Sequence, residues 1–407
     1  MKNPFLFFSA VVISCSSFGQ AVIKSMKRLP DTGETTSYTT TFGEDNDYTI
    51  NPPYFTINGN GTVTDTVTGL MWQQKDGGEM TIERAIYYCD TLTLGGYTDW
   101  RLPLPHEGFS ILNHQYANPA VNTTVFTTTT AQYWWTSERQ ANDTTKIWVT
   151  NAGGGIGNHP KSETISAGGT KIFSARAVRD VTPPPTIPNR FTDNGNGTIT
   201  DNLTTLVWQK IVYSDSITWE QALTYADTLA LNGNTDWRLP NIKELESIDD
   251  ESLVNPSINR TFFSTMVTNK YWSSSSLPNQ PTKAWYLDTQ FGITTYDFKT
   301  LRHYLICVRG IPSITTNINR LTNTLDQINI YPNPATTMIT ITSSANIKEI
   351  KIINLLGEVV STNSPTNNQS TIDISQLSKG IYFIEVQADG SASSPTNNVI
   401  RKKFVKQ

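Results

Sequence analysis

The chain contains one stretch twice. The six letters TDWRLP at residues 98–103 return at residues 235–240. Upstream of them, YFTINGNGTVTDTVTGLMWQQ at 54–74 returns as RFTDNGNGTITDNLTTLVWQK at 190–210. Further matching blocks follow in the same order, which indicates two copies of one domain rather than a single large fold.

This duplication predicts the organisation of all 407 residues. A chain of this length suits about three domains. Prolines in the segment between the copies favour an extended spacer. The predicted parts are a signal peptide at 1–20, an N-terminal extension at 21–53, repeat 1 at 54–180, a Pro-rich linker at 181–189, repeat 2 at 190–312, a second linker at 313–326 and a C-terminal domain at 327–407.

The first twenty residues are typical of an export signal. MKNPFLFFSAVVISCSSFGQ begins with a lysine, continues with an apolar run and ends in small residues. The apolar run is far shorter than the roughly 20 residues that cross a bilayer, and we expect no transmembrane segment. Val12-Ile13-Ser14-Cys15 also has the form of a lipobox, so lipidation of Cys15 stays open as an alternative to cleavage near Gly19.

The composition narrows the class of protein. Lys and Arg number 31 against 35 for Asp and Glu, a balance that argues against a nucleic-acid partner. Aromatic residues make up 10% of the chain and charged residues only 16%. Such usage is typical of a β-rich extracellular protein.

The sequence pattern of each copy predicts a hairpin followed by two helices. The Asn-Gly pairs of FTDNGNGTITD predict a tight hairpin, while the spacing of its acidic residues does not fit a calcium loop. ITWEQALTYADTL predicts a helix with Thr218 and Gln221 as a capping box. LPNIKELESI predicts a second helix, capped by Asn241 with Glu244 three residues on. Repeat 1 has Pro105 in the first turn of the equivalent helix.

TDWRLP is predicted to be the junction between a turn, a strand and the second helix. Trp237 and Leu239 are expected to be buried, and Pro240 to end the strand. Arg238 is expected to pair with a carboxylate, Glu244 or Asp236, in a structural rather than catalytic role.

The two copies resemble a known bacterial family. NGNGTVTD, TGLMWQ, DWRLP, YWW and RAVRD, in that order, are similar to the Lcl C-terminal domain, a domain of unknown function found in a collagen-like adhesin. The resemblance implies an α+β fold class with two C-type lectin-like domains, each with two helices on a small antiparallel sheet and long loops on one side. It also implies an adhesin-like role.

The C-terminal domain resembles the type IX secretion sorting domain. Its short alternating strands separated by turn residues predict a small all-β, immunoglobulin-like sandwich. The resemblance implies Sec export, passage across the outer membrane and a location that is secreted or on the outer cell surface, with the secretion machinery and a sortase-like protease as partners. The motif residues are Tyr331, Pro332, Asn333, Pro334, Gly357, Gly380 and Tyr382.

Lectin-like folds commonly bridge a helix cysteine to the last strand, and each copy retains one half of such a pair. Cys89 lies in copy one and Cys307 in copy two, with Ala177 and Ala226 at the partner positions. We therefore predict two buried free thiols rather than an inter-repeat disulfide.

The chain is not expected to be an enzyme and is expected to need neither metal nor other cofactor. Its four histidines lack paired metal spacing, and no G-x-S-x-G motif occurs. In the Gly-rich run 151–162, Pro160 offers no N–H to a phosphate, which excludes a phosphate loop.

Two functions remain open at this stage. One is a secreted binding protein that recognises a glycan or another surface; the alternative is a structural surface or matrix component without a small ligand. Copy one has additional residues after Trp148 and reads YWWTSE where copy two reads YWSSSS. We therefore expect copy one to bind more tightly. The predicted ligand residues are Trp134, Trp135, Asn151, His159 and Lys161.

Overall fold

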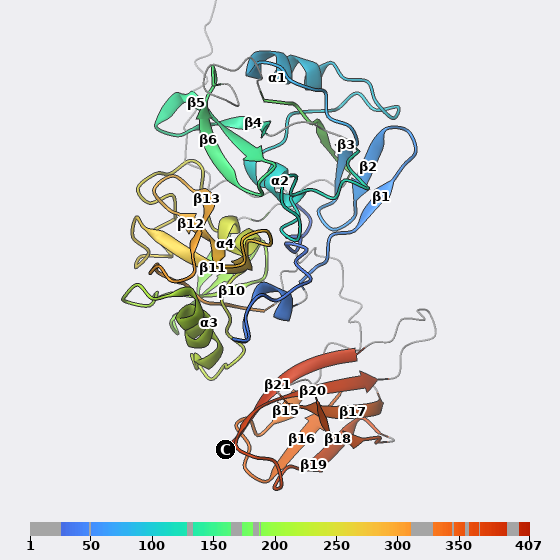
Figure 1. The fold of residues 1–407 in the computed structure, drawn as a ribbon, viewed down its shortest axis with the longest axis vertical. Coiled ribbons are helices and arrows are strands. Elements are labelled where there is room, and N and C mark those ends of the chain that lie inside the picture. The colour runs from blue at the N-terminus through green and yellow to red at the C-terminus, as the bar shows by residue number, and fades with distance from the viewer. Residues whose placement is uncertain are drawn as a thin grey trace, which may run out of the picture. The chain divides into compact units, whose positions relative to one another are not determined.

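The computed structural model divides the chain into two compact units, Met1–Thr316 and Asn317–Gln407, each considered by itself (Figure 1). The predicted signal peptide, most of the Pro-rich linker, the linker at 313–326 and Gly357 lie outside the described residues. The described residues are 26–48, 50–127, 133–163, 173–181, 187, 189–310, 329–343, 346–354, 358–365, 367–388 and 399–407.

The predicted fold class is wrong. Strands take up 37% of the chain and helices 11%, in several antiparallel sheets, so the protein is mostly β rather than an α+β pair of C-type lectin-like domains. The stretches that were expected to be long loops, rich in Tyr, Trp, Thr and Ser, form long hairpins because such residues suit strands. The helices of the described chain are short, with at most ten residues.

Each repeat contains two helices and a small sheet, in which three strands from the start of the repeat are joined by its last strand. The sheets have the orders β1-β2-β3-β7 and β14-β10-β9-β8. Their elements in repeat 1 are β1 (Phe55–Ile57), β2 (Thr62–Asp65), β3 (Leu70–Gln73), α1 (Ile82–Asp90), α2 (Pro105–Ser110) and β7 (Val178–Asp180). Those in repeat 2 are β8 (Phe191–Asp193), β9 (Thr198–Asp201), β10 (Val207–Gln209), α3 (Trp219–Thr228), α4 (Ile242–Ser247) and β14 (Val308–Arg309).

The local predictions for these elements are confirmed. The Asn-Gly hairpins join β1 to β2 and β8 to β9, and Gly61 has the positive φ of +84° that an L side chain rarely adopts. α3 has its capping box at Thr218. α4 begins after Asn241, whose Oδ1 accepts from the Glu244 backbone N–H at 2.8 Å. Pro105 opens α2.

The two repeats share a second sheet. Its order is β11-β12-β13-β6-β5-β4, so each repeat contributes three consecutive strands and the sheet joins where β6 meets β13. At this junction Ile156 pairs with Thr294, and the Ile156 N–H donates to Thr294 Oγ1 at 3.0 Å. The strands are β4 (Tyr133–Gln140), β5 (Asp143–Asn151), β6 (Ile156–Pro160), β11 (Lys270–Ser276), β12 (Lys283–Asp288) and β13 (Ile293–Phe298). The repeats therefore form one continuous body.

The TDWRLP junction has the predicted structural role. Trp237 and Leu239 are buried in the core of repeat 2. Arg238 donates two hydrogen bonds to the Glu244 carboxylate, at 2.5 and 2.6 Å. The other candidate, Asp236, pairs with Arg309 instead.

The C-terminal unit consists of two sheets around one apolar core. The sheets have the orders β15-β16-β19 and β18-β17-β20-β21. Isoleucines of β16 and β17 fill the space between them, as expected for a small β-sandwich. The strands are β15 (Asn329–Tyr331), β16 (Met338–Thr342), β17 (Ile347–Ile353), β18 (Val359–Asn363), β19 (Gln369–Asp373), β20 (Gly380–Ala388) and β21 (Val399–Lys406).

Candidate functional site

The tryptophans of the predicted ligand site belong to the core. Trp134 and Trp135 are neighbours on β4, so their side chains point to opposite faces of the sheet, and both are buried. The Trp134 indole N–H donates to Asp76 at 3.3 Å, and the Trp135 indole N–H donates to the Met80 carbonyl oxygen at 2.8 Å. Neither ring forms part of an exposed patch.

Asn151 holds a turn. It ends β5, and its Oδ1 accepts from the backbone N–H groups of Gly153 and Gly155 at 2.9 and 3.3 Å. These bonds fix the connection to β6, so the oxygen of this amide is engaged within the protein.

His159 and Lys161 are partly exposed. His159 Nδ1 lies 2.9 Å from Glu163 Oε2, and its ring packs edge-on against Tyr133 and Phe173 at centroid distances of 5.1 and 5.5 Å. The structure therefore places His159 with Tyr133 and Phe173 rather than with the two tryptophans. Sequence reasoning missed both partners, although strand alternation places Tyr133 on the face of Trp135.

The sequence comparison matched Tyr133 of β4 with Tyr271 of β11. The structure shifts this match by one residue. Thr136 Oγ1 donates to the Trp148 carbonyl oxygen at 2.7 Å, and Ser273 Oγ donates to the Trp285 carbonyl oxygen at 2.8 Å. The two hydroxyls are therefore equivalent. The equivalent pairs are Tyr133 with Lys270, Trp134 with Tyr271 and Trp135 with Trp272.

This register changes the comparison of the copies. The aromatic residue that repeat 2 lacks is Tyr133, not a tryptophan as predicted. In its place Lys270 lies 3.5 Å from Asp297, which also approaches His303 at 3.4 Å. The additional residues of copy one lie between β6 and Phe173, and residues 164–172 are outside the described part of the chain.

Repeat 2 has exposed aromatic side chains on β13. Tyr296 and Phe298 lie on one face of this strand and are 36% and 50% exposed. The Lys283 ammonium lies 5.1 and 4.8 Å from their ring centroids. We call Tyr296, Phe298 and Lys283 the β13 platform.

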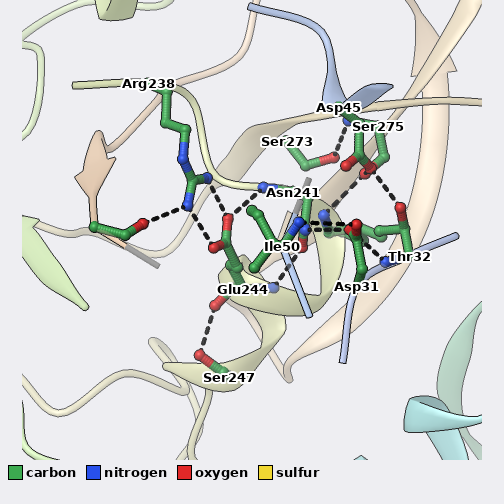
Figure 2. A network of polar contacts seen from close by, with 12 residues as sticks. Asp31, Thr32, Asp45, Ile50, Arg238, Asn241, Glu244, Ser247, Ser273 and Ser275 are labelled. Carbon is green, nitrogen blue, oxygen red and sulfur yellow. Dashed lines mark hydrogen bonds and ion pairs between the residues drawn. The ribbon is translucent and has the colours of Figure 1, made fainter. Parts of the chain in front are cut away.

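A polar network joins the N-terminal segment to repeat 2 (Figure 2). Asp45 Oδ2 accepts from Thr32 at 2.8 Å and from Ser275 at 2.5 Å. Asn241 Nδ2 donates to Asp31 Oδ1 at 3.3 Å. Sequence reasoning gave these residues no role, because nothing in the pattern shows that a segment preceding repeat 1 packs on repeat 2.

Burial changes the acid strength of this network. Desolvation raises the pKa of Asp31 to about 6 and the pKa of Asp45 to about 8, and it raises the pKa of Glu34 well above its usual value. It lowers the pKa of Lys243 to about 8. Lys243 Nζ donates to the carbonyl oxygens of Asp31 and Ser110 at 2.8 Å each, which links the N-terminal segment to both repeats.

The two cysteines are free and buried, as predicted. Desolvation raises the pKa of the Cys89 thiol to about 12 and also raises that of Cys307. Among the described residues, no group of three or more His, Cys, Asp or Glu side chains is placed to hold a metal ion. Within the same residues, no helix has the length and hydropathy of a membrane span.

Two solved structures match the chain at low sequence identity. PorZ, a surface component of the type IX secretion system of Porphyromonas gingivalis, matches at 16% identity and a TM-score of 0.18, over 30% of this chain and 15% of its own. CopC from Methylosinus trichosporium OB3b matches at 11% identity and a TM-score of 0.15, over 20% of this chain and 91% of its own. No curated protein matches the sequence.

Family comparisons cover most of the described chain. Residues 329–405 match the secretion system C-terminal sorting domain, so the protein is exported by type IX secretion to the cell surface or the medium. This domain also implies contact with the type IX secretion machinery. Residues 61–178 and 197–309, more than half of the chain, match the Lcl C-terminal domain. The chain therefore belongs to the Lcl C-terminal domain family, with two copies in tandem ahead of a sorting domain.

Proposed function

We propose that the tandem repeats are the extracellular binding part of an adhesin-like, non-catalytic protein, and that the ligand is a glycan on a cell or matrix surface. A sortase-like protease removes the sorting domain during attachment or release. The observation that carries the proposal is the β13 platform, where two exposed aromatic rings lie on one face of a strand beside an ammonium group.

The chemistry of the platform suits a sugar. Aromatic rings offer flat apolar faces for the C–H side of a pyranose, while the Tyr296 hydroxyl and the Lys283 ammonium can hydrogen-bond its hydroxyl groups. Both residues sit on paired strands of the shared sheet, which holds them in fixed positions. The surface is therefore formed without a ligand-induced change.

Repeat 1 offers a second, smaller surface. His159 is partly exposed beside Tyr133, and Lys161 follows β6 and is also partly exposed, whereas the predicted contacts Trp134 and Trp135 lie in the core. Replacing Trp135 would change the packing of repeat 1 and would not report on a ligand contact.

A glycan array probed with the full-length protein, followed by titration of the best glycan, tests the proposal. We expect Phe298→Ala to weaken binding about tenfold, as for an aromatic anchor. His159→Ala measures the contribution of repeat 1, and Ile211→Ala is the matched control, because Ile211 is an exposed apolar residue at the end of the other sheet of repeat 2. If Phe298→Ala leaves glycan binding unchanged, the β13 platform is not the binding site. The absence of binding to any glycan would favour the structural alternative.

A further inference from the structure

The N-terminal segment covers one face of repeat 2. Gly43 lies against α3, where a Cβ built on it would be 3.7 Å from Leu223 Cβ. The Tyr48 ring lies 5.3 Å from the Arg238 guanidinium carbon. Glu44 accepts a hydrogen bond from Ser276 Oγ. The covered face of repeat 2 thus joins an apolar helix position, an arginine and the end of β11.

The equivalent helix position in repeat 1 is uncovered. α1 and α3 begin after equivalent threonines, which makes Ile86 the counterpart of Leu223. Leu223 is 0% exposed and Ile86 is 42% exposed. A large aliphatic side chain on the surface is the direct consequence of the missing cover.

The TDWRLP arginines and the serines of β4 and β11 are also more exposed in repeat 1 than in repeat 2. Arg101 and Arg238 each pair with a glutamate of the following helix, but their side chains are 32% and 5% exposed. Ser137 and Ser274 each donate a backbone N–H to the proline oxygen of the TDWRLP junction at 2.8 Å. Ser274 is buried and Ser137 is exposed.

We propose that this open face of repeat 1, formed by Ile86, Arg101, Ser137 and Arg139, is a docking site for an extended acidic peptide of a partner protein. The geometry of the occupied face defines the ligand: an aromatic ring over the arginine, a small or apolar residue against the helix and a carboxylate at the strand end.

Charge complementarity supports an acidic peptide. Arg139 occupies the position of Ser276, the group that binds the Glu44 carboxylate in repeat 2. Arg139 is exposed. Its charged guanidinium can donate to a carboxylate, and such a hydrogen bond is stronger than one from a neutral hydroxyl. Glu138 replaces Ser275, so the acidic group of the partner pairs with Arg139 rather than with its neighbour.

The described part of the chain places no segment of its own on this face. Its N-terminal segment is engaged on repeat 2 through Asp45 and Asp31. The linker that precedes repeat 2, residues 181–189, is much shorter than the segment that precedes repeat 1. Both facts favour a partner protein as the occupant.

A synthetic peptide with the sequence of residues 37–48, SYTTTFGEDNDY, is the probe. It is labelled with a fluorophore and titrated with the full-length protein by fluorescence polarisation. We expect saturable binding that Ile86→Ser and Arg139→Ala each weaken about tenfold, as for central interface residues. Ile57→Ser is the matched control, because Ile57 is also an exposed isoleucine of repeat 1 but lies on β1.

A photo-reactive version of the peptide locates the site. Cross-links to residues near α1 and the end of β4 support the proposal. Cross-links confined to repeat 2 would mean that the peptide displaces the protein's own segment, and would overturn it. Failure to bind saturably, or equal binding by the Ile86 and Arg139 variants, would overturn it as well.

Discussion

Replacing the TDWRLP arginine in each repeat tests how much the N-terminal cover strengthens the arginine pair of repeat 2. Arg238→Met and Arg101→Met remove equivalent guanidinium groups while keeping the apolar part of each side chain. Arg238 is surrounded by Glu244, the Tyr48 ring and the Gly310 carbonyl oxygen, which it approaches at 3.1 Å. Arg101 contacts Glu107 and Asp180, and none of the aromatic rings that the structure describes lies over its guanidinium.

The two substitutions should lower the free energy of unfolding by different amounts. Removing one partner of a fully buried pair leaves an uncompensated charge and costs about 3–5 kcal/mol of unfolding free energy, the range that we expect for Arg238→Met. Arg101 and Asp180 are partly open to water, whereas Glu107 is as buried as Glu244, so water solvates only one of the two carboxylates that Arg101→Met leaves behind. We expect Arg101→Met to cost about 2–3 kcal/mol, between the values for surface and buried pairs, because water can enter the partly open position that the guanidinium leaves.

Urea unfolding followed by tryptophan fluorescence is the assay. All ten tryptophans lie in the two repeats and none in the sorting domain, so the signal reports on the first unit alone. The urea concentration at the midpoint of unfolding should fall further for Arg238→Met than for Arg101→Met. The slope of the unfolding free energy against urea concentration should stay unchanged in both variants. Equal losses would refute the reasoning, because they would show that the N-terminal cover does not strengthen the Arg238 pair.

Three other predictions follow from the structure. Because the pKa values of Asp31 and Asp45 are raised to about 6 and about 8, the folded state favours the protonated forms of both carboxyls. The resulting contribution to the unfolding free energy is full below pH 4 and is lost as the pH rises to about 8. Hydrogen exchange of the N-terminal segment should therefore speed up over that range beyond the intrinsic rate, and less so in Asp45→Asn. Cys89 and Cys307 should resist a thiol reagent until urea unfolds the protein, and unreduced peptides should show no link between them. Deletion from Tyr331 onward should leave the protein in the periplasm, and normal levels outside the cell would contradict the sorting role.

Local structure could be predicted from the sequence where neighbouring residues determine it. The capping box of Asn241 and Glu244 depends on three-residue spacing, and the Asn-Gly hairpins depend on positive φ. Glu244 was one of two carboxylates predicted to pair with Arg238, because it lies in the first turn of the helix that follows this arginine. Each of these interactions spans at most six residues.

Long-range pairing could not be predicted in the same way. The join of β6 to β13 brings together residues 138 positions apart, and no local pattern indicates it. The predicted lectin-like class failed for this reason, since the shared sheet draws both repeats into one β structure. The one-residue error in aligning Tyr133 arose because YWW and YWS look equivalent as letters, whereas the Thr136 and Ser273 hydrogen bonds set a different register.

The shared sheet also gives a physical reason for the duplication. Without its partner, β6 or β13 would be the edge of a three-stranded sheet, and an exposed edge is a template for pairing with other chains. Placing two copies in tandem joins these edges at Ile156 and Thr294 within one chain. The N-terminal segment then covers the face of repeat 2 around Leu223 and Arg238, while the equivalent face of repeat 1 around Ile86 and Arg101 stays open. Two copies of one fold thus acquire different surfaces through a cover that is present on only one of them.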